Sequence, residues 1–128
     1  MKMQLKLRIL DGRYGLAQLP SGGATPDWIS GRFSAVISSQ EGITVVCDET
    51  VLPDDAKAQS GFRCLEIGGV FDLASVGVLA AVIQPLATAG ISVFAYSTWE
   101  TDYILLQETD LNLAVSALMK AGHAVHQN

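Results

Sequence analysis

The sequence contains little charge and few of the residue types that usually build catalytic or metal sites. Charged residues make up 16% of the 128 residues, and the chain has two cysteines and two histidines. His123 and His126 are too few for a metal site, and we expect them to lie at the surface or edge of a last strand. Phosphate-binding loops, dinucleotide-binding glycine motifs and Ser-His-Asp or Cys-His arrangements are also missing. We therefore predict a protein without catalytic activity, metal or cofactor.

Basic residues are outnumbered by acidic ones, which gives a net charge of −5 and an isoelectric point near 4.7. An acidic chain lacks the positive surface with which proteins bind nucleic acids or anionic membranes. No apolar run approaches the roughly 20 residues that a membrane-spanning helix requires. From Leu5 to Ile9, apolar residues alternate with basic ones, which is typical of a strand and not of a signal peptide. We expect a cytoplasmic protein that binds neither nucleic acid nor membrane.

The two cysteines, Cys47 and Cys64, lie far apart in apolar segments. Their spacing fits neither a CxxC motif nor a cluster of metal ligands. We interpret them as buried, reduced thiols. A disulfide or a reactive thiol is the alternative.

Apolar residues are abundant, at 49% of the chain. A chain of this length forms one domain, or two very small modules that share a core. Because so little charge is available to cover the surface, we expect some apolar surface to meet a partner. That partner is either another copy of the chain or a different protein.

The first half of the chain is predicted to be rich in strands. The expected strands are residues 5–10, 14–19, 33–38 and 43–47, of which the last two form a hairpin. Residues 26–29 resemble one short helical turn, and residues 51–60 contain either the start of a short helix or a linker.

The second half, from Phe62 to Val125, has the pattern strand, glycine turn, helix, strand, turn, strand, helix, strand. The order βαββαβ gives a four-stranded antiparallel sheet with two helices on one face, as in ferredoxin-like folds. We therefore predict an α+β protein in which a strand-rich module precedes a ferredoxin-like module. Folds of this kind have many functions, so the order alone assigns none.

Apolar spacing and capping residues predict the limits and buried faces of the two helices. The first helix is expected to run from an N-cap at Ser75 to about Ala89 and to end at Gly90, while Gly122 closes the second. Pro85 predicts a kink or a shorter first helix. The expected buried face of the first helix is Val76, Leu79, Ala80, Ile83, Leu86 and Ala87. That of the second is Leu111, Ala114, Val115, Leu118 and Met119.

Three segments of the second half resemble the ACT domain, a small regulatory module that binds amino acids. They run from Gly69 to Leu79, from Pro85 to Phe94 and from Ser97 to Leu105. More narrowly, they resemble the paired-ACT subfamily, which includes small bacterial proteins and the arginine-sensing proteins of animal nutrient signalling. The resemblance implies an ACT domain at residues 61–128, preceded at residues 1–60 by a degenerate ACT-like module.

The resemblance also implies a non-catalytic protein that pairs side by side with another ACT module, as a homodimer or larger assembly. An amino acid or similar small effector would bind at that junction. The turn before the first helix would hold the amino and carboxylate groups of the ligand with Asp72, Leu73, Ser75, Val76, Gly77 and Val78. The opposite wall would consist of Ser97, Thr98 and Asp102. Asp102 matches the position that contacts a cationic ligand side chain in the arginine sensors.

The chemistry of these residues agrees with that role, although structural roles are also open. Free N–H groups at a helix N-terminus bind carboxylates, and Gly77 would let a ligand approach the backbone closely. Asp72 or Asp102 suits an ammonium or guanidinium group. Alternatively, Asp72 ends a strand, Ser75 is only an N-cap, Gly77 serves helix–sheet packing and Asp102 is a turn residue. The functional alternatives are a protein-interaction module without a ligand and, last, an enzyme with an unrecognised site.

Overall fold

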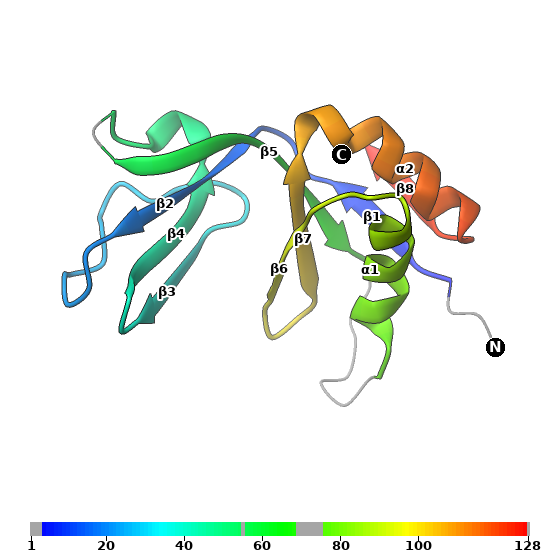
Figure 1. Cartoon of the computed structure of the whole chain (residues 1–128), viewed down its shortest axis with the longest axis horizontal. Coiled ribbons are helices and arrows are strands. Elements are labelled where there is room, and N and C mark those ends of the chain that lie inside the picture. The colour runs from blue at the N-terminus through cyan, green and yellow to red at the C-terminus, as the bar shows by residue number, and fades with distance from the viewer. Residues whose placement is uncertain (1–3, 55, 69–75, 128) are drawn as a thin grey trace. The chain divides into compact units, whose positions relative to one another are not determined.

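The computed structural model describes residues 4–54, 56–68 and 76–127 (Figure 1). The chain forms two compact units. Unit 1 consists of Met1–Asp11 and Arg63–Asn128, and unit 2 of Gly12–Phe62. The long strand β5 (Lys57–Ile67) crosses the boundary, so its first part belongs to unit 2 and its second part to unit 1.

Unit 1 has the predicted βαββαβ order. After β5 follow α1 (Val78–Thr88), β6 (Phe94–Ser97), β7 (Asp102–Gln107), the short 3-10 helix η2 (Glu108–Asp110), α2 (Leu111–Lys120) and β8 (Ala124–Gln127). The fold is therefore α+β and ferredoxin-like, as predicted.

The sheet of unit 1 differs from the prediction in one strand. β1 (Lys6–Ile9) pairs antiparallel with β5 and parallel with β8, and β7 pairs with β5 and β6. The strand order is β6-β7-β5-β1-β8, with five strands instead of four and one parallel pair. The prediction of a four-stranded antiparallel sheet was wrong because the N-terminal strand lies between β5 and β8. A strand predicted for the first module, at residues 1–60, thus belongs to unit 1.

The core of unit 1 lies between one face of this sheet and the two helices. Side chains of a strand alternate between faces, so every second residue of β1, β5 and β7 points to the helices. The fully buried members of this cluster are Leu7, Leu65, Ile67, Val82, Leu86, Ile104, Leu106, Ala114 and Leu118. Burial of each large aliphatic side chain contributes ~1.5–3 kcal/mol. None of the helices that the structure describes is long and apolar enough to cross a membrane.

The first helix begins later and is rotated relative to the prediction. α1 starts at Val78 with Gly77 as its N-cap, while Ser75 lies outside the described residues. Its buried residues are Val78, Val82 and Leu86, whereas Ala80 and Ala87 are exposed. Almost every position of α1 is apolar, so the sequence pattern could not select one face. The helix continues through Pro85 to Thr88.

The second helix follows the prediction except at one residue. Ala114 and Leu118 are buried, and Leu111 and Val115 pack against the core. Met119 is 59% exposed, so its assignment to the buried face was wrong. The predicted helix ends are confirmed, because Gly90 and Gly122 have positive φ angles of 79° and 99° and donate their N–H groups back to the last turns.

Unit 2 is an antiparallel sheet in the order β3-β4-β2-β5. Its elements are β2 (Tyr14–Leu19), β3 (Ala35–Ser39), β4 (Gly42–Asp48), the 3-10 helix η1 (Glu49–Val51) and the first part of β5. The predicted hairpin is confirmed as β3–β4.

Two local predictions for unit 2 were wrong. Residues 26–29 form no helical turn, but Trp28 and Ile29 pack against the cluster of Ala17, Ile43, Val45 and Cys47. Lys57–Ser60 belong to β5 instead of a helix or linker. All four of these side chains are exposed, so the strand forms through backbone pairing with β2 and leaves no apolar pattern in the sequence.

Both cysteines are free and buried, which confirms that prediction. Burial, with the nearby carboxylate of Glu66, raises the pKa of the Cys64 thiol to about 12. A thiol with such a pKa stays protonated at neutral pH, so Cys64 is a poor nucleophile.

Candidate functional site

The predicted wall residues meet at the tip of the β6–β7 hairpin. Ser97 and Asp102 are directly paired across the two strands, and the Ser97 hydroxyl donates a hydrogen bond to Oδ1 of Asp102. The Thr98 N–H donates to the Thr101 carbonyl at 2.8 Å, and the Thr98 hydroxyl lies 3.2 Å from the same oxygen. These bonds close the four-residue loop and hold the Asp102 carboxylate in one orientation.

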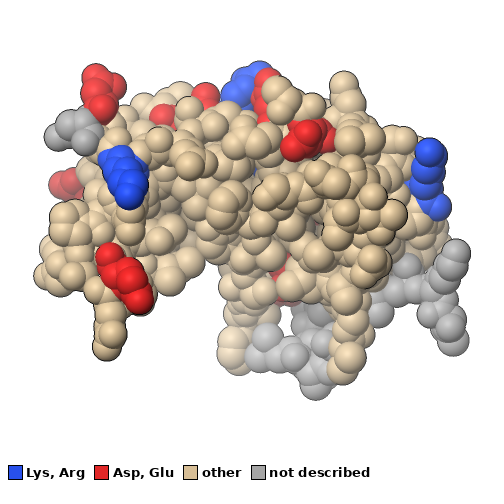
Figure 2. Space-filling model, viewed as in Figure 1, with Lys and Arg blue, Asp and Glu red and all other residues tan. Residues whose placement is uncertain are grey.

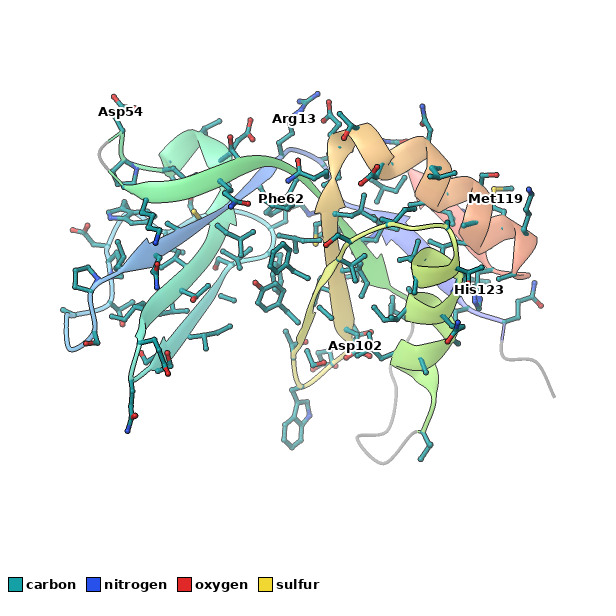
Figure 3. The ribbon with its side chains drawn as sticks, viewed as in Figure 1. Arg13, Asp54, Phe62, Asp102, Met119 and His123 are labelled. Carbon is teal, nitrogen blue, oxygen red and sulfur yellow. The ribbon has the colours of Figure 1, made fainter. Side chains whose placement is uncertain are left out.

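The hairpin tip is attached beside the end of β5. The Thr101 hydroxyl donates to the backbone carbonyl of Ile67, the last residue of β5. The segment that follows Ile67 in the sequence leads to α1 and contains the predicted ligand-binding turn. Asp102 lies two and four residues before the buried Ile104 and Leu106, and residues at this spacing in a strand share one face of the sheet. Asp102 therefore lies at the end of the sheet face that the helices cover. Figure 3 shows Asp102 at this end of the hairpin.

A second set of contacts holds the start of β7 from the opposite face of the sheet. The Tyr103 hydroxyl donates to Oε2 of Glu66 at 3.0 Å, and Arg8 pairs with Oε1 of the same carboxylate at 2.6 Å. Burial, with the Glu66 carboxylate, raises the pKa of Tyr103 to about 12. Because residues on both sides of Asp102 are bound to β5, the backbone beneath this carboxylate is held in place. Sequence reasoning missed this contact, since Glu66 lies 37 residues before Tyr103.

Only part of the predicted turn can be described. Asp72, Leu73 and Ser75 lie outside the described residues. Val76 is 88% exposed, whereas Val78 is 7% exposed and belongs to the core, so only its backbone is available to a ligand. The structure thus places one predicted contact residue in the core and leaves another open to solvent.

Gly77 occupies an open position at the start of α1. Its φ angle is 86°, and a Cβ at this position would meet no heavy atom within 4 Å. The alternative role in helix–sheet packing is therefore wrong. The first backbone hydrogen bond of the helix runs from the Ala81 N–H to the Gly77 carbonyl, and Gly77 provides no side-chain cap. The N–H groups that precede this bond have no partner in the helix and are suited to a carboxylate.

The charge at the hairpin tip is negative. Asp102 has no cationic partner among the described residues, and the neighbouring Glu100 is exposed. α1 contains no ionisable residue. The arrangement therefore offers one oriented carboxylate with hydroxyl groups beside it, which suits a ligand with a positive group. The described residues contain no group of three or more His, Cys, Asp or Glu side chains that could hold a metal ion.

We predicted that His123 lies at the surface or edge of the last strand. This prediction was wrong, because the residue is buried and only 5% exposed. Its Nδ1 accepts a hydrogen bond from the Leu5 N–H at 3.1 Å, so the proton of the neutral ring lies on Nε2. Nε2 is 3.0 Å from the Ala81 carbonyl and donates to it. In a regular helix that carbonyl would accept from residue 85, but Pro85 has no N–H. A proline four residues after Ala81 was the signal in the sequence for an unpaired carbonyl, yet nothing local pointed to His123.

Comparisons with known proteins agree with this fold. Residues 57–120 match the family model described as the ACT domain. A crystal structure of an Agobacterium tumefaciens protein is 32% identical, over 98% of this chain and 95% of that chain, with a TM-score of 0.93. No curated protein matches the sequence.

Structures of lower sequence identity show only that the fold is similar. A Vibrio cholerae protein of unknown function is 23% identical over 93% of this chain and 91% of that chain, with a TM-score of 0.76. The regulatory subunit of aspartate kinase from Thermus thermophilus is 14% identical over 85% of this chain and 91% of that chain, with a TM-score of 0.60.

Proposed function

The chain belongs to the ACT domain family, and on that premise we propose that it is a regulatory or sensor protein that binds an amino acid or similar small effector and catalyses no reaction. The observation that carries the proposal is the Asp102 carboxylate, held by Ser97 and attached through Thr101 beside the end of β5. ACT domains are regulatory modules, and a fixed carboxylate that has no cationic partner in the described part of the chain is a ready contact for a charged ligand.

In the proposed complex, each group of the ligand has a partner of opposite charge. The ligand carboxylate binds the free N–H groups at the start of α1, next to Gly77. A positive group of the ligand binds Asp102, and the hydroxyl groups of Ser97 and Thr98 complete the wall. Asp72, Leu73, Ser75 and the backbone of Val76 and Val78 are the proposed remainder of the turn. A cationic side chain on the ligand would agree with the narrower likeness to arginine-sensing proteins, which stays a prediction.

We propose that the site is completed where the ACT domain pairs with another ACT module in a homodimer or larger assembly. A ligand that binds the paired state more tightly than the unpaired state shifts the population toward it. A protein partner would then distinguish the two states. A cytoplasmic location is part of the proposal and is supported by the two free, buried thiols, since thiols stay reduced in the cytosol.

The test is a thermal-shift screen of the purified chain against the standard amino acids, followed by the variant Asp102→Asn. A ligand at about 100 times its Kd stabilises the folded state by about 2.7 kcal/mol, which raises Tm by several degrees. We expect Asp102→Asn to weaken binding of a cationic ligand by about tenfold or more, because a charge-assisted hydrogen bond is lost. The matched control is Glu100→Gln, which removes an exposed carboxylate from the same loop.

Equal loss of binding in the Glu100 control, or none in Asp102→Asn, would contradict the assignment of Asp102. If no amino acid raises Tm at millimolar concentration, the ligand-binding proposal fails. The alternative is then a protein-interaction module without a ligand, which the small number of charged residues in α1 and α2 favours.

A further inference from the structure

The hydroxyl groups at the tip of the β6–β7 hairpin all donate their protons within the protein. Ser97 donates to the Asp102 carboxylate. Thr98 donates to the Thr101 carbonyl, and Thr101 in turn donates to the Ile67 carbonyl. Carboxylate and carbonyl oxygens only accept hydrogen bonds, so the partner fixes the direction of each bond. A hydroxyl has a single proton, so none of the three has a proton left for a ligand.

The polar side chains on one face of this tip therefore offer only acceptor atoms. Ser97 and Asp102 lie directly opposite each other in β6 and β7, so their side chains share one face of the sheet. The Ser97 oxygen keeps its lone pairs, and Ser97 uses only Oδ1 of the carboxylate, not Oδ2. We refer to Ser97 Oγ and the Asp102 carboxylate together as the acceptor surface. The one side-chain donor of the adjoining loop is Trp99, which is 78% exposed (Figure 2 shows the whole surface of the molecule).

We propose that the acceptor surface selects amino acids whose side chain ends in a primary ammonium or a guanidinium group, and that it does so by N–H donors as well as by charge. The inference rests on the proposed ligand site and names Ser97 as a specificity-determining residue within it. Asp102 and the exposed Glu100 make the hairpin tip negative, which favours a ligand with a net positive charge. An ammonium has three N–H groups and a guanidinium five, so either can bond to Asp102 and Ser97 at once.

Charge alone and hydrogen bonding make different predictions for a methylated ammonium. A trimethylammonium group keeps its positive charge but has no N–H, so it forms no hydrogen bond with Ser97 or Asp102. Its methyl groups would also displace water from these oxygens, and an acceptor that loses water without a new donor costs free energy. The acceptor surface should therefore reject a trimethylated ligand although the charges attract.

The same argument gives the ligand one orientation. The first hydrogen bond of α1 runs from the Ala81 N–H to the Gly77 carbonyl, so the N–H groups before Ala81 are donors without a partner in the helix. These donors suit the carboxylate of an amino acid. At the acceptor surface a carboxylate would meet only acceptors, because the Ser97 proton is used by Asp102. The two ends of the ligand therefore cannot exchange places.

The test is calorimetric titration of the full chain with lysine, arginine, Nε-trimethyllysine and norleucine. Norleucine has the carbon chain of lysine without the ammonium group, and trimethyllysine keeps the charge without the N–H groups. We expect lysine to bind at least about tenfold more tightly than trimethyllysine, because charge-assisted hydrogen bonds are lost. Norleucine should bind most weakly of the four.

Three variants show whether Ser97 provides this selectivity. Ser97→Ala should weaken lysine binding by about tenfold and leave trimethyllysine binding unchanged, because only lysine bonds to the hydroxyl oxygen. Ser97→Thr keeps a hydroxyl and should retain the affinity for lysine. The matched control is Ser116→Ala, which removes an exposed hydroxyl from α2 and should change neither affinity. Circular dichroism checks that each variant is folded.

The outcomes separate this inference from the proposed function. If trimethyllysine binds as tightly as lysine, charge alone selects the ligand, and the inference fails while the proposed function stands. Stronger binding of trimethyllysine to Ser97→Ala would show that crowding causes the discrimination, which also overturns the inference. So would the absence of binding by lysine and arginine when another amino acid raises Tm. If no amino acid raises Tm, the proposed function fails and the inference fails with it.

Discussion

At the scale of single residues, the Ser97–Asp102 pair and His123 differ in what they do. Ser97 and Asp102 form an accessible pair at a hairpin tip with a carboxylate available to a ligand. His123 is buried, and both of its ring nitrogens are used within the fold. A buried, fully paired imidazole stabilises structure and offers nothing to a ligand, so the functional candidate is the first arrangement.

The role of His123 leads to a prediction about stability. His123→Ala leaves the Leu5 N–H and the Ala81 carbonyl without partners in the core, and each unsatisfied buried group costs about 1–3 kcal/mol. We expect the free energy of unfolding to fall by about 2–5 kcal/mol, measured by urea denaturation. The control His126→Ala changes an exposed histidine three residues later and should alter stability by less than about 0.5 kcal/mol. Similar effects of the two substitutions would contradict the role of His123.

At the scale of elements, α1 has similar glycines at its two ends. Gly77 precedes the helix with φ 86° and Gly90 follows it with φ 79°, and a Cβ added at either position would meet no heavy atom within 4 Å. Side chains are therefore disfavoured at both sites by backbone conformation and not by crowding. Only Gly77 lies at the end where helix N–H groups are free.

This similarity makes Gly90 a matched control for Gly77. We expect Gly77→Ala and Gly90→Ala each to lower the free energy of unfolding by about 1–2 kcal/mol, because alanine is strained at positive φ. If the backbone at Gly77 approaches the ligand, only Gly77→Ala should also weaken ligand binding, measured by calorimetry with an amino acid found in the screen. Unchanged affinity in Gly77→Ala, or an equal loss in Gly90→Ala, would remove Gly77 from the site.

At the scale of the whole molecule, unit 2 is an insertion within unit 1. β1 precedes residues 12–62 and the other elements of unit 1 follow them. β1 pairs with both β5 and β8 and buries Leu7 and Ile9 under the helices. The ACT match at residues 57–120 therefore does not include a strand that lies inside its own sheet.

The insertion predicts how fragments of the chain behave. Residues 61–128 alone lack β1, so β5 and β8 lose their shared partner and the core loses ~1.5–3 kcal/mol for each large side chain that β1 buries. Because total stabilities are about 5–15 kcal/mol, we expect this fragment to show no cooperative unfolding in circular dichroism. Joining residues 1–11 to 63–128 by a short glycine-serine linker should restore it, since the Leu10 N–H is 2.9 Å from the Cys64 carbonyl. A sharp unfolding transition of residues 61–128 alone would contradict this prediction.

What the amino-acid sequence determined about this protein is its local order. Alternation, helical spacing and glycine positions predicted the βαββαβ series, the β3–β4 hairpin, the glycine ends of both helices and the buried cysteines, because these features depend on residues close together in the chain. The resemblance to the ACT domain also singled out Ser97 and Asp102, which the structure pairs across β6 and β7.

Tertiary structure alone decided the features that depend on distant residues. The place of β1 between β5 and β8, the buried side of the nearly all-apolar α1 and the exposure of Met119 each depend on which surfaces meet. The pairing of His123 with the carbonyl that Pro85 leaves unpaired joins residues 42 positions apart. Local patterns carry no information about such contacts, because partners are selected by packing and hydrogen-bond satisfaction across the whole core.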